Sequence, residues 1–316
     1  MQLKIYSLIA YLIIFAPMNN IDKIETNLKA HVKHLSEDIG TRTYQETEKL
    51  NRAADYIEEK FRSYRCNVKR QSFKAENKTY YNIEAEVKGT SSGDGIIIVG
   101  AHYDTAWGTP GADDNASGVA GLLELSRLTS EKPLPPMGRR LTVRFVAFAL
   151  EEPPFFRTRN MGSYVYAESL KNEGANVKGM VALEMLGYFC DKKGCQYYPL
   201  PFFRWFYPDK GNFLAFVGNI RSRQFTLKMK KAFQKSSSLP VESLNTISLV
   251  PGVDLSDHLS FWRFGYPAFM ITDTAFYRNP HYHGYGDRAD TLDYKRMAEF
   301  VRGFYKAVEV VMGEEK

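Results

Sequence analysis

The sequence has 316 residues, of which 44% are hydrophobic and 14% aromatic, so the chain can bury a sizeable core as one domain or as one domain with an insertion. This composition excludes a disordered or fibrous protein. The net charge of +6 is modest for this length, and no cluster of Lys and Arg is interleaved with aromatic residues. These features argue against a nucleic-acid-binding protein.

Residues 1–17 form a possible signal or anchor segment. One Lys precedes the apolar residues 5–16, a stretch that is too short to span a membrane comfortably but fits the hydrophobic region of a signal peptide. No small-residue cleavage pattern follows at residues 15–18. Three alternatives therefore remain: an export signal with an atypical cleavage site, an uncleaved membrane anchor, or a true start at Met18. We expect export or anchoring, and a cytoplasmic protein only if Met18 is the start.

The N-terminal third of the chain predicts two helices, two strands and then a buried strand. Apolar residues recur with helical spacing in residues 21–35 and again in residues 45–64. Residues 66–73 and 80–88 alternate between polar and apolar side chains, as strands do. Residues 96–99 are Ile-Ile-Ile-Val, a composition typical of a strand that is buried on both faces. This strand stops at Gly100, just before His102.

Strands and helices then alternate along the middle of the chain. Residues 118–129 and 162–170 predict helices, whereas residues 140–150 and 177–186 predict strands that end in acidic residues. Alternation of this kind is typical of a largely parallel sheet.

Residues 187–216 break the pattern, since they are rich in aromatic residues, Pro and Gly and lack clean periodicity. We interpret them as an insertion over the mouth of the site, within a single domain that covers residues 21–316.

Later strands are expected at residues 213–217 and 266–272, and later helices at residues 222–235 and 293–311, with a short helix opening at Asp257-His258.

The aromatic residues of the insertion form either a small core of their own or the wall of a pocket that prefers bulky apolar side chains. They are Tyr197, Tyr198, Phe202, Phe203, Trp205 and Phe206.

Charged residues recur where successive strands end. Because ligands bind at the carboxyl ends of strands in open α/β sheets, these residues are candidates for one site. Imidazole and carboxylate groups together form the ligand set that suits zinc, and several carboxylates in one cleft would repel each other without a cation. The candidates are His102, Asp114, Glu151, Glu152, Glu184 and His283.

Spacing separates these candidates into roles. Side chains at positions i and i+2 of an extended segment share a face, so Asp104 can lie behind His102 and accept its second ring N–H. Adjacent residues point in opposite directions, so Glu151 and Glu152 cannot easily bind the same ion. One of the two is therefore free to act as a general base on a metal-bound water.

The three cysteines leave two alternatives open. Cys190 and Cys195 close a short loop that can hold a disulfide in an oxidising compartment, which would leave Cys66 unpaired. The other alternative is that all three cysteines are free thiols in a reducing cytosol.

The candidate residues lie in five sequence blocks that resemble those of the M28 zinc-dependent exopeptidases, the group of bacterial leucyl aminopeptidases and glutaminyl cyclases. The blocks are His102-Tyr103-Asp104, Gly111-Ala112-Asp113-Asp114-Asn115-Ala116-Ser117-Gly118, Glu151-Glu152 with Met161-Gly162-Ser163, Glu184-Met185, and Tyr282-His283 followed by Asp287. The segment from Ser256-Asp257-His258 to Gly265-Tyr266-Pro267-Ala268 also resembles the one that precedes the last ligand. The resemblance implies an α/β fold, a three-layer αβα sandwich with a mostly parallel, mixed central sheet.

The resemblance also implies a role for each residue. Asp114 would bridge two zinc ions, of which one is completed by His102 and Glu184 and the other by Glu152 and His283, and Glu151 would be the general base. We predict that Asp104 and Asp257 lie behind the ligands. Three rivals have other expected roles: Asp113 caps the following helix, His281 is a loop residue, and His258 is structural or lies behind the ligands.

The expected function is hydrolysis of the N-terminal peptide bond of peptides. The main alternative is a glutaminyl cyclase, which uses one zinc ion for intramolecular acyl transfer. A non-catalytic, receptor-like ectodomain is another alternative, and a carboxypeptidase is a further one. The expected partners are peptide substrates, with no nucleic acid and no membrane contact except through an N-terminal anchor; the oligomeric state stays open.

Overall fold

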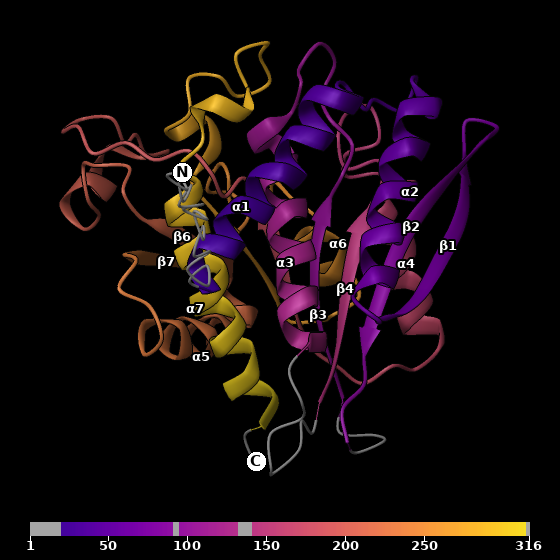
Figure 1. Cartoon of the computed structure of the whole chain (residues 1–316). Coiled ribbons are helices and arrows are strands. Elements are labelled where there is room, and N and C mark those ends of the chain that lie inside the picture. Colours follow the sequence, from indigo (N-terminus) through magenta and orange to yellow (C-terminus); the bar gives the residue numbers. More distant parts are fainter. Residues whose placement is uncertain (1–19, 91–94, 132–140, 314–316) are drawn as a thin grey trace, which may run out of the picture.

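An eight-stranded mixed sheet forms the centre of the fold (Figure 1), in a computed structural model that describes residues 20–90, 95–131 and 141–313. The strand order is β1-β2-β4-β3-β5-β8-β6-β7. The strands are β1 (Asn67–Ala75), β2 (Lys78–Val87), β3 (Ile96–His102), β4 (Thr142–Phe148), β5 (Val177–Glu184), β6 (Leu214–Asn219), β7 (Val241–Thr246) and β8 (Ala268–Thr272).

The four central strands, β4, β3, β5 and β8, are parallel, so their carboxyl ends meet at one edge of the sheet. The β1–β2 hairpin joins β4 in antiparallel fashion. On the other side, β6 is antiparallel to β8 and parallel to β7. Side chains at the carboxyl ends of these strands are therefore brought to one end of the molecule.

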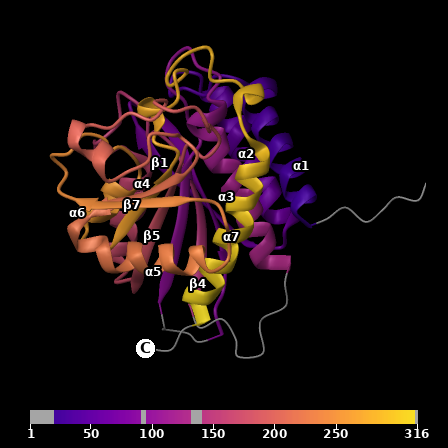
Figure 2. The same cartoon turned by 90° about the vertical axis from the view of Figure 1, so that its left-hand side faces the viewer.

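Helices cover both faces of the sheet, as the side view shows (Figure 2). One face packs against α1 (Asn20–Lys33), α2 (Thr47–Ser63), α3 (Gly118–Glu131), α5 (Arg223–Gln234) and α7 (Tyr294–Gly313). The other face packs against α4 (Gly162–Asn172) and α6 (His258–Arg263). This arrangement confirms the predicted three-layer αβα sandwich with a mostly parallel sheet.

Side-chain alternation explains why the sheet has a core on each face. In β3, Ile97 and Val99 lie in the cluster beneath α3, whereas Ile98 lies in the cluster that includes α4 and α6 residues. Because both faces are covered, this strand has the continuous apolar composition read from the sequence. In α2, apolar residues three or four positions apart bury one stripe against the sheet. They are Leu50, Ala53, Ala54, Ile57 and Phe61.

One strand of the sheet was not expected from the sequence. Strand β7 was not predicted, because its sequence Val-Glu-Ser-Leu-Asn-Thr lacks the continuous apolar run of the central strands. Strand β6 (Leu214–Asn219) confirms the strand expected at residues 213–217, whose first residues overlap the end of the predicted insertion. The predicted signal or anchor segment, residues 1–17, lies outside the described residues. Within the described ranges, no helix has the combination of length and apolar character that crossing a bilayer needs.

Candidate metal centre and active site

His102 and Glu184 end two neighbouring parallel strands. Gly100 of β3 pairs with Ala182 of β5, so the side chains two residues further along each strand share a face and meet. The Nε2 atom of His102 lies 3.3 Å from Oε2 of Glu184, and both side chains are buried. Ser256 donates a 2.7 Å hydrogen bond to the same carboxylate oxygen and so fixes its orientation.

Asp114 lies between the two histidines of the predicted ligand set. Its Oδ1 atom is 3.4 Å from Nε2 of His102, and its Oδ2 atom is 3.1 Å from Nε2 of His283. Glu152 approaches the same His283 nitrogen at 3.4 Å. The carboxylate therefore faces two groups of side chains, with His102 and Glu184 on one side and His283 and Glu152 on the other.

Asp104 supports the loop that carries Glu151 and Glu152. Its two carboxylate oxygens accept the backbone N–H of Glu151 at 3.1 Å and that of Glu152 at 3.0 Å. The Nδ1 atom of His102 lies 3.2 Å from the backbone oxygen of Asp104 and 3.6 Å from its carboxylate. Asp104 thus lies behind His102 and behind the glutamate pair, but its backbone oxygen, and not its carboxylate as expected, is within hydrogen-bond distance of the ring.

Burial and crowding perturb the titration of these groups. Burial raises the pKa of Glu151 well above its usual range, and nearby Glu184 and Glu152 add to the effect. Burial likewise raises the pKa of Glu152 to about 7. Burial opposes ionisation of Asp114 as well, but hydrogen bonds from His102 and His283 outweigh it and hold its pKa below the usual range. Several carboxylates in one buried site need positive charge to be ionised together.

A divalent cation fits these residues. The Oε1 atom of Glu152 is buried and has no hydrogen-bond partner among the described residues, so it is an available ligand atom. One ligand atom each from His102, Asp114 and Glu152 lie within 4.8 Å of one another. Histidine nitrogen and carboxylate oxygen are ligands that zinc accepts. The donor set and its burial therefore suit a zinc-type centre.

Comparison with known proteins identifies the family. The model of peptidase family M28 matches residues 82–308. The chain belongs to peptidase family M28. It is thereby assigned to the hydrolases, as the sequence predicted. The uncharacterized protein YfbL of Escherichia coli (strain K12) is 46% identical over 284 residues, which cover 87% of this chain and 85% of that protein.

Other M28 relatives carry named activities. A probable leucine aminopeptidase of Arthroderma otae is 29% identical over 231 residues, which cover 70% of this chain and 54% of that protein. The chain thus spans about half the length of this fungal relative.

Solved structures share the fold. The LapA aminopeptidase of Legionella pneumophila superposes with a TM-score of 0.72 at 21% identity, covering 94% of this chain and 74% of that one. BSAP, a zinc aminopeptidase of Bacillus subtilis, gives a TM-score of 0.72 at 16% identity and coverages of 91% and 95%. The glutaminyl cyclase of Porphyromonas gingivalis superposes with a TM-score of 0.66 at 17% identity, covering 91% of this chain and 98% of that one.

Two residues that the sequence analysis left without a role support Asp114 in this M28 site. Asp287 accepts the backbone N–H groups of Asp113 and Asp114 at 2.7 and 3.0 Å. The Asn115 side chain accepts the N–H of Met185 at 3.1 Å and donates to the carbonyl of Leu183 at 2.8 Å, which ties the loop to the end of β5. Both lie in the quoted motif blocks, which was the signal available in the sequence.

Asp113 does not cap the helix that follows it, so that prediction is wrong. Its carboxylate accepts the backbone N–H of Gly187 at 2.8 Å and the side-chain amide of Asn279 at 2.9 Å. The N–H of Gly118, at the start of α3, lies 3.2 Å from Oδ1 of Asn115 instead. The chain turns away from helical geometry at Asp114, which directs the Asp113 side chain away from α3.

The remaining candidates are also placed. Asp257 is fully buried, its carboxylate has no hydrogen-bond partner among the described residues, and burial raises its pKa to about 7. His258 is a structural residue: its Nε2 atom lies 2.8 Å from the carbonyl oxygen of Val253, and burial lowers its pKa to about 4. His281 lies in the loop before His283, where its ring contacts the edge of Tyr188.

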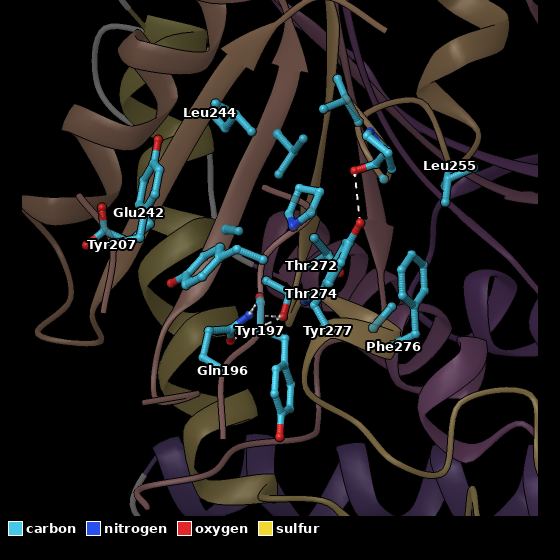
Figure 3. A pocket seen from close by; sticks show the side chains of 18 of the residues that line it. Gln196, Tyr197, Tyr207, Glu242, Leu244, Leu255, Thr272, Thr274, Phe276 and Tyr277 are labelled. Atoms are coloured by element: carbon cyan, nitrogen blue, oxygen red, sulfur yellow. Dashed lines mark hydrogen bonds between the residues drawn. The ribbon is translucent and has the colours of Figure 1, made fainter. Parts of the chain in front are cut away.

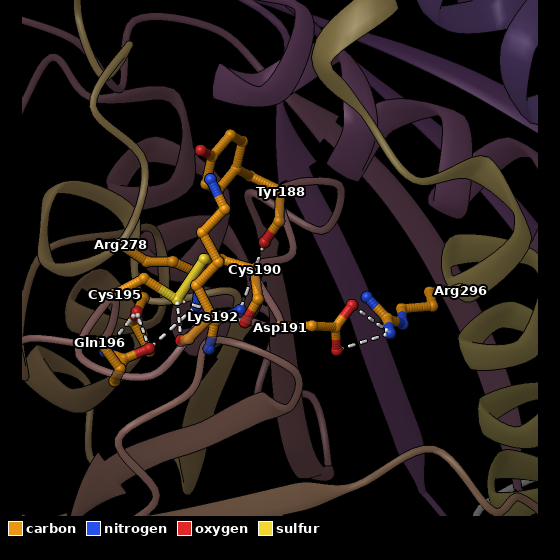
Figure 4. The surroundings of a disulfide bond; sticks show 9 residues. Tyr188, Cys190, Asp191, Lys192, Cys195, Gln196, Arg278 and Arg296 are labelled. Carbon is orange, nitrogen blue, oxygen red and sulfur yellow. Dashed lines mark hydrogen bonds and ion pairs between the residues drawn. A yellow bond between two sulfur atoms is a disulfide. The ribbon is translucent and has the colours of Figure 1, made fainter.

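The segment between β5 and β6 is held by a disulfide between Cys190 and Cys195 (Figure 4). Cys190 also pairs with Gly211 across the segment. Asp191 forms a 2.9 Å ion pair with Arg296 of α7, which ties the loop to the helical layer. Cys66 is a free thiol.

A pocket of about 110 Å³ has Glu184 in its lining. Figure 3 shows side chains that line this pocket, among them Tyr197 of the segment. Tyr197, Tyr198 and Phe203 line it, as the pocket hypothesis required. The other predicted wall residues, Phe202, Trp205 and Phe206, are exposed and do not line it. Predominantly apolar side chains form the rest of the pocket, so it can receive a substrate side chain next to the candidate metal centre.

Proposed function

We propose that this protein is a di-zinc aminopeptidase that hydrolyses the N-terminal peptide bond of peptides. The observation that carries the proposal is the position of Asp114, whose two carboxylate oxygens each face a different histidine. In the proposed site, His102, Asp114 and Glu184 would hold one ion, and His283, Asp114 and Glu152 would hold the other. Bound zinc would polarise the scissile carbonyl and lower the pKa of the attacking water.

Glu151 is the proposed general base. Its backbone is fixed by Asp104, and its Oε2 atom lies 3.9 Å from Nε2 of His102, beside the ligands. Its carboxylate would take a proton from the attacking water and return it to the leaving amine. Glu152, the next residue, points toward His283, so the adjacent glutamates divide into a base and a ligand.

Aminopeptidase activity is favoured by the neighbouring pocket and by relatives. Glu184 is shared by the candidate metal centre and the pocket lining, so one substrate side chain would lie directly beside the reacting carbonyl. Relatives named leucine aminopeptidase and the zinc aminopeptidase of Bacillus subtilis support the same activity and the same metal. The structural likeness to a glutaminyl cyclase keeps single-zinc acyl transfer as the second candidate.

The testing experiment measures zinc per chain on purified, dialysed protein, together with hydrolysis of Leu-p-nitroanilide before and after chelation. We expect about two zinc ions per chain and release that stops with chelator. One zinc ion with no release, but with cyclisation of an N-terminal Gln peptide, would favour the cyclase. A protein that binds no zinc would instead be a receptor-like family member.

We also propose that the protein is exported or anchored outside the cytoplasm. The Cys190–Cys195 disulfide and the apolar residues 5–16 support this location. Fractionation of cells that express the full chain tests it, because recovery in the cytoplasmic fraction alone would contradict export.

A further inference from the structure

A row of four paired residues crosses the sheet from the candidate metal centre to its edge. Glu184 of β5 pairs with Thr272 of β8, Thr272 pairs with Ala215 of β6, and Ala215 pairs with Glu242 of β7. Directly paired residues point to the same face of a sheet, and all four line the pocket. Three strand spacings separate the ends of the row, so the backbones of Glu184 and Glu242 are about 14 Å apart.

Between its two acidic ends, the pocket floor is apolar. The next row across the same strands consists of Met270, Val217 and Leu244, which also line the pocket. Of the described residues that line the pocket, Glu184 and Glu242 are the acidic ones and none is basic. The pocket therefore has a largely apolar floor between Glu184 at one end of the row and Glu242 at the other.

The far end combines the Glu242 carboxylate with aromatic rings, and Figure 3 shows Glu242 beside Tyr207. The rings of Tyr198 and Tyr207 stack with centroids 5.8 Å apart. Their hydroxyls donate to backbone carbonyls, Tyr198 to Pro208 at 2.6 Å and Tyr207 to Ser243 at 3.0 Å. Fixed aromatic rings next to a carboxylate are suited to binding an organic cation.

Lys230 is the cation already near Glu242 in the described part of the chain. Its Nζ atom lies 3.8 Å from Oε2 of Glu242 and donates a shorter, 3.2 Å hydrogen bond to Oγ of Ser243. The Glu242 side chain is 33% exposed, so this long contact contributes little stability. A carboxylate has two oxygens and about four acceptor positions, so a second cation can bind from the pocket side.

We propose that Glu242 determines specificity by binding the cationic end of a substrate's N-terminal Lys or Arg side chain. This inference rests on the proposed aminopeptidase function. The apolar stem of such a side chain packs on the floor, while its charged end reaches Glu242 and the tyrosine rings. A leucine side chain is too short to reach the anionic end, and norleucine matches the lysine stem but offers no charge to it.

The test compares kcat/KM for Lys- and norleucine-aminomethylcoumarin, whose side chains share a linear stem. We expect wild type to favour the lysine substrate, and Glu242→Gln to lower the Lys-to-norleucine ratio by about tenfold. Lys230→Met removes the competing cation and should raise the ratio. Glu46→Gln is the matched control, since Glu46 pairs with Lys49, is 35% exposed and does not line the pocket; its ratio should equal that of wild type.

Binding gives a second measurement that does not depend on turnover. Isothermal titration of the zinc-loaded protein should show tighter binding of free L-lysine than of free L-norleucine, which have no amide bond to hydrolyse, with the difference reduced in Glu242→Gln. If wild type hydrolyses both substrates and neither variant changes their ratio, the inference is overturned and the aminopeptidase assignment stands. If wild type hydrolyses no N-terminal amide, the proposed function fails and the inference fails with it. Should Glu242→Gln not fold, the Lys230→Met ratio decides the question alone.

Discussion

The clearest test of the site's construction is Asp104→Asn. The Asp104 carboxylate is buried and accepts one backbone N–H from Glu151 and one from Glu152, at 3.1 and 3.0 Å. Asparagine has nearly the same shape but keeps one acceptor oxygen. Its amide group would therefore place a donor against one of the two backbone N–H donors.

The expected loss follows from these two hydrogen bonds. Each bond to a buried carboxylate is worth about 1.5–3 kcal/mol, and the substitution removes one of them and weakens the other. We expect the free energy of unfolding to fall by about 2–3 kcal/mol. Glu151 would also shift, and a displacement of about 1 Å in a catalytic group lowers turnover by roughly 100-fold.

Urea denaturation and kcat/KM for Leu-p-nitroanilide measure the two effects on the same zinc-loaded samples. Asp55→Asn is the control, because Asp55 is 64% exposed and pairs with Arg70 on the surface, so its loss should stay below about 1 kcal/mol. An Asp104→Asn protein with wild-type stability and wild-type turnover would refute the idea that this carboxylate holds the glutamate loop.

Other predictions concern the base, the cysteines and a buried histidine. Glu151→Gln should retain zinc while kcat falls by about 1,000-fold or more, measured by metal analysis and steady-state kinetics, because the amide cannot accept the proton. Maleimide labelling of the unfolded, unreduced protein should modify Cys66 alone, and all three cysteines after reduction of the Cys190–Cys195 bond. Burial lowers the pKa of His31 from 6.5 to about 3, so the folded state binds fewer protons between these values and should lose about 4 kcal/mol of stability as the pH falls through this window. Urea titrations from pH 7 to pH 4 should show that the free energy of unfolding falls less in His31→Gln than in wild type.

Each of these predictions has a contrasting outcome. Normal turnover in Glu151→Gln would rule that residue out as the base. Labelling of three thiols without reduction would show that the disulfide does not form in the isolated protein. His34→Gln is the matched histidine substitution, since the His34 side chain is 35% exposed and the variant keeps the buried His31. If the free energy of unfolding changed equally with pH in His31→Gln and in wild type, the prediction of a buried, neutral His31 would be contradicted.

Much of the candidate site could be predicted because parallel strands carry it. His102 and Glu184 each end a strand with an apolar run, so the sequence itself marks where those side chains emerge. Because β3 and β5 are parallel neighbours, both side chains lie at the same edge of the sheet, and this does not depend on the conformation of the loops. The position of Asp104 two residues after His102 was likewise informative, because local geometry dictates which face it shares.

The rest depends on pairings between segments that are far apart in sequence. Asp287 reaches the backbone of Asp114 across 173 positions, and no local pattern indicates which loop a carboxylate will support. The Glu242 end of the pocket arises because β8 inserts between β5 and β6, out of chain order. A strand as polar as β7 gives no periodic signal, so neither the strand nor its acidic residue was predicted.

A buried cation balances part of the negative charge of the carboxylates at this sheet edge. Arg42 is fully buried, and its side chain donates to the carbonyls of Tyr103 at 2.8 Å, Leu35 at 2.7 Å and Gly111 at 3.1 Å. Burial lowers its pKa to about 10, against the effect of nearby Asp287, Asp104 and Asp114, so it stays protonated at neutral pH. The hydrogen bonds of its side chain go to carbonyl oxygens, and within the described ranges no carboxylate forms an ion pair with it. Its charge offsets part of the negative charge of Asp287, Asp104 and Asp114, and the metal proposed for this site would balance the remaining carboxylates.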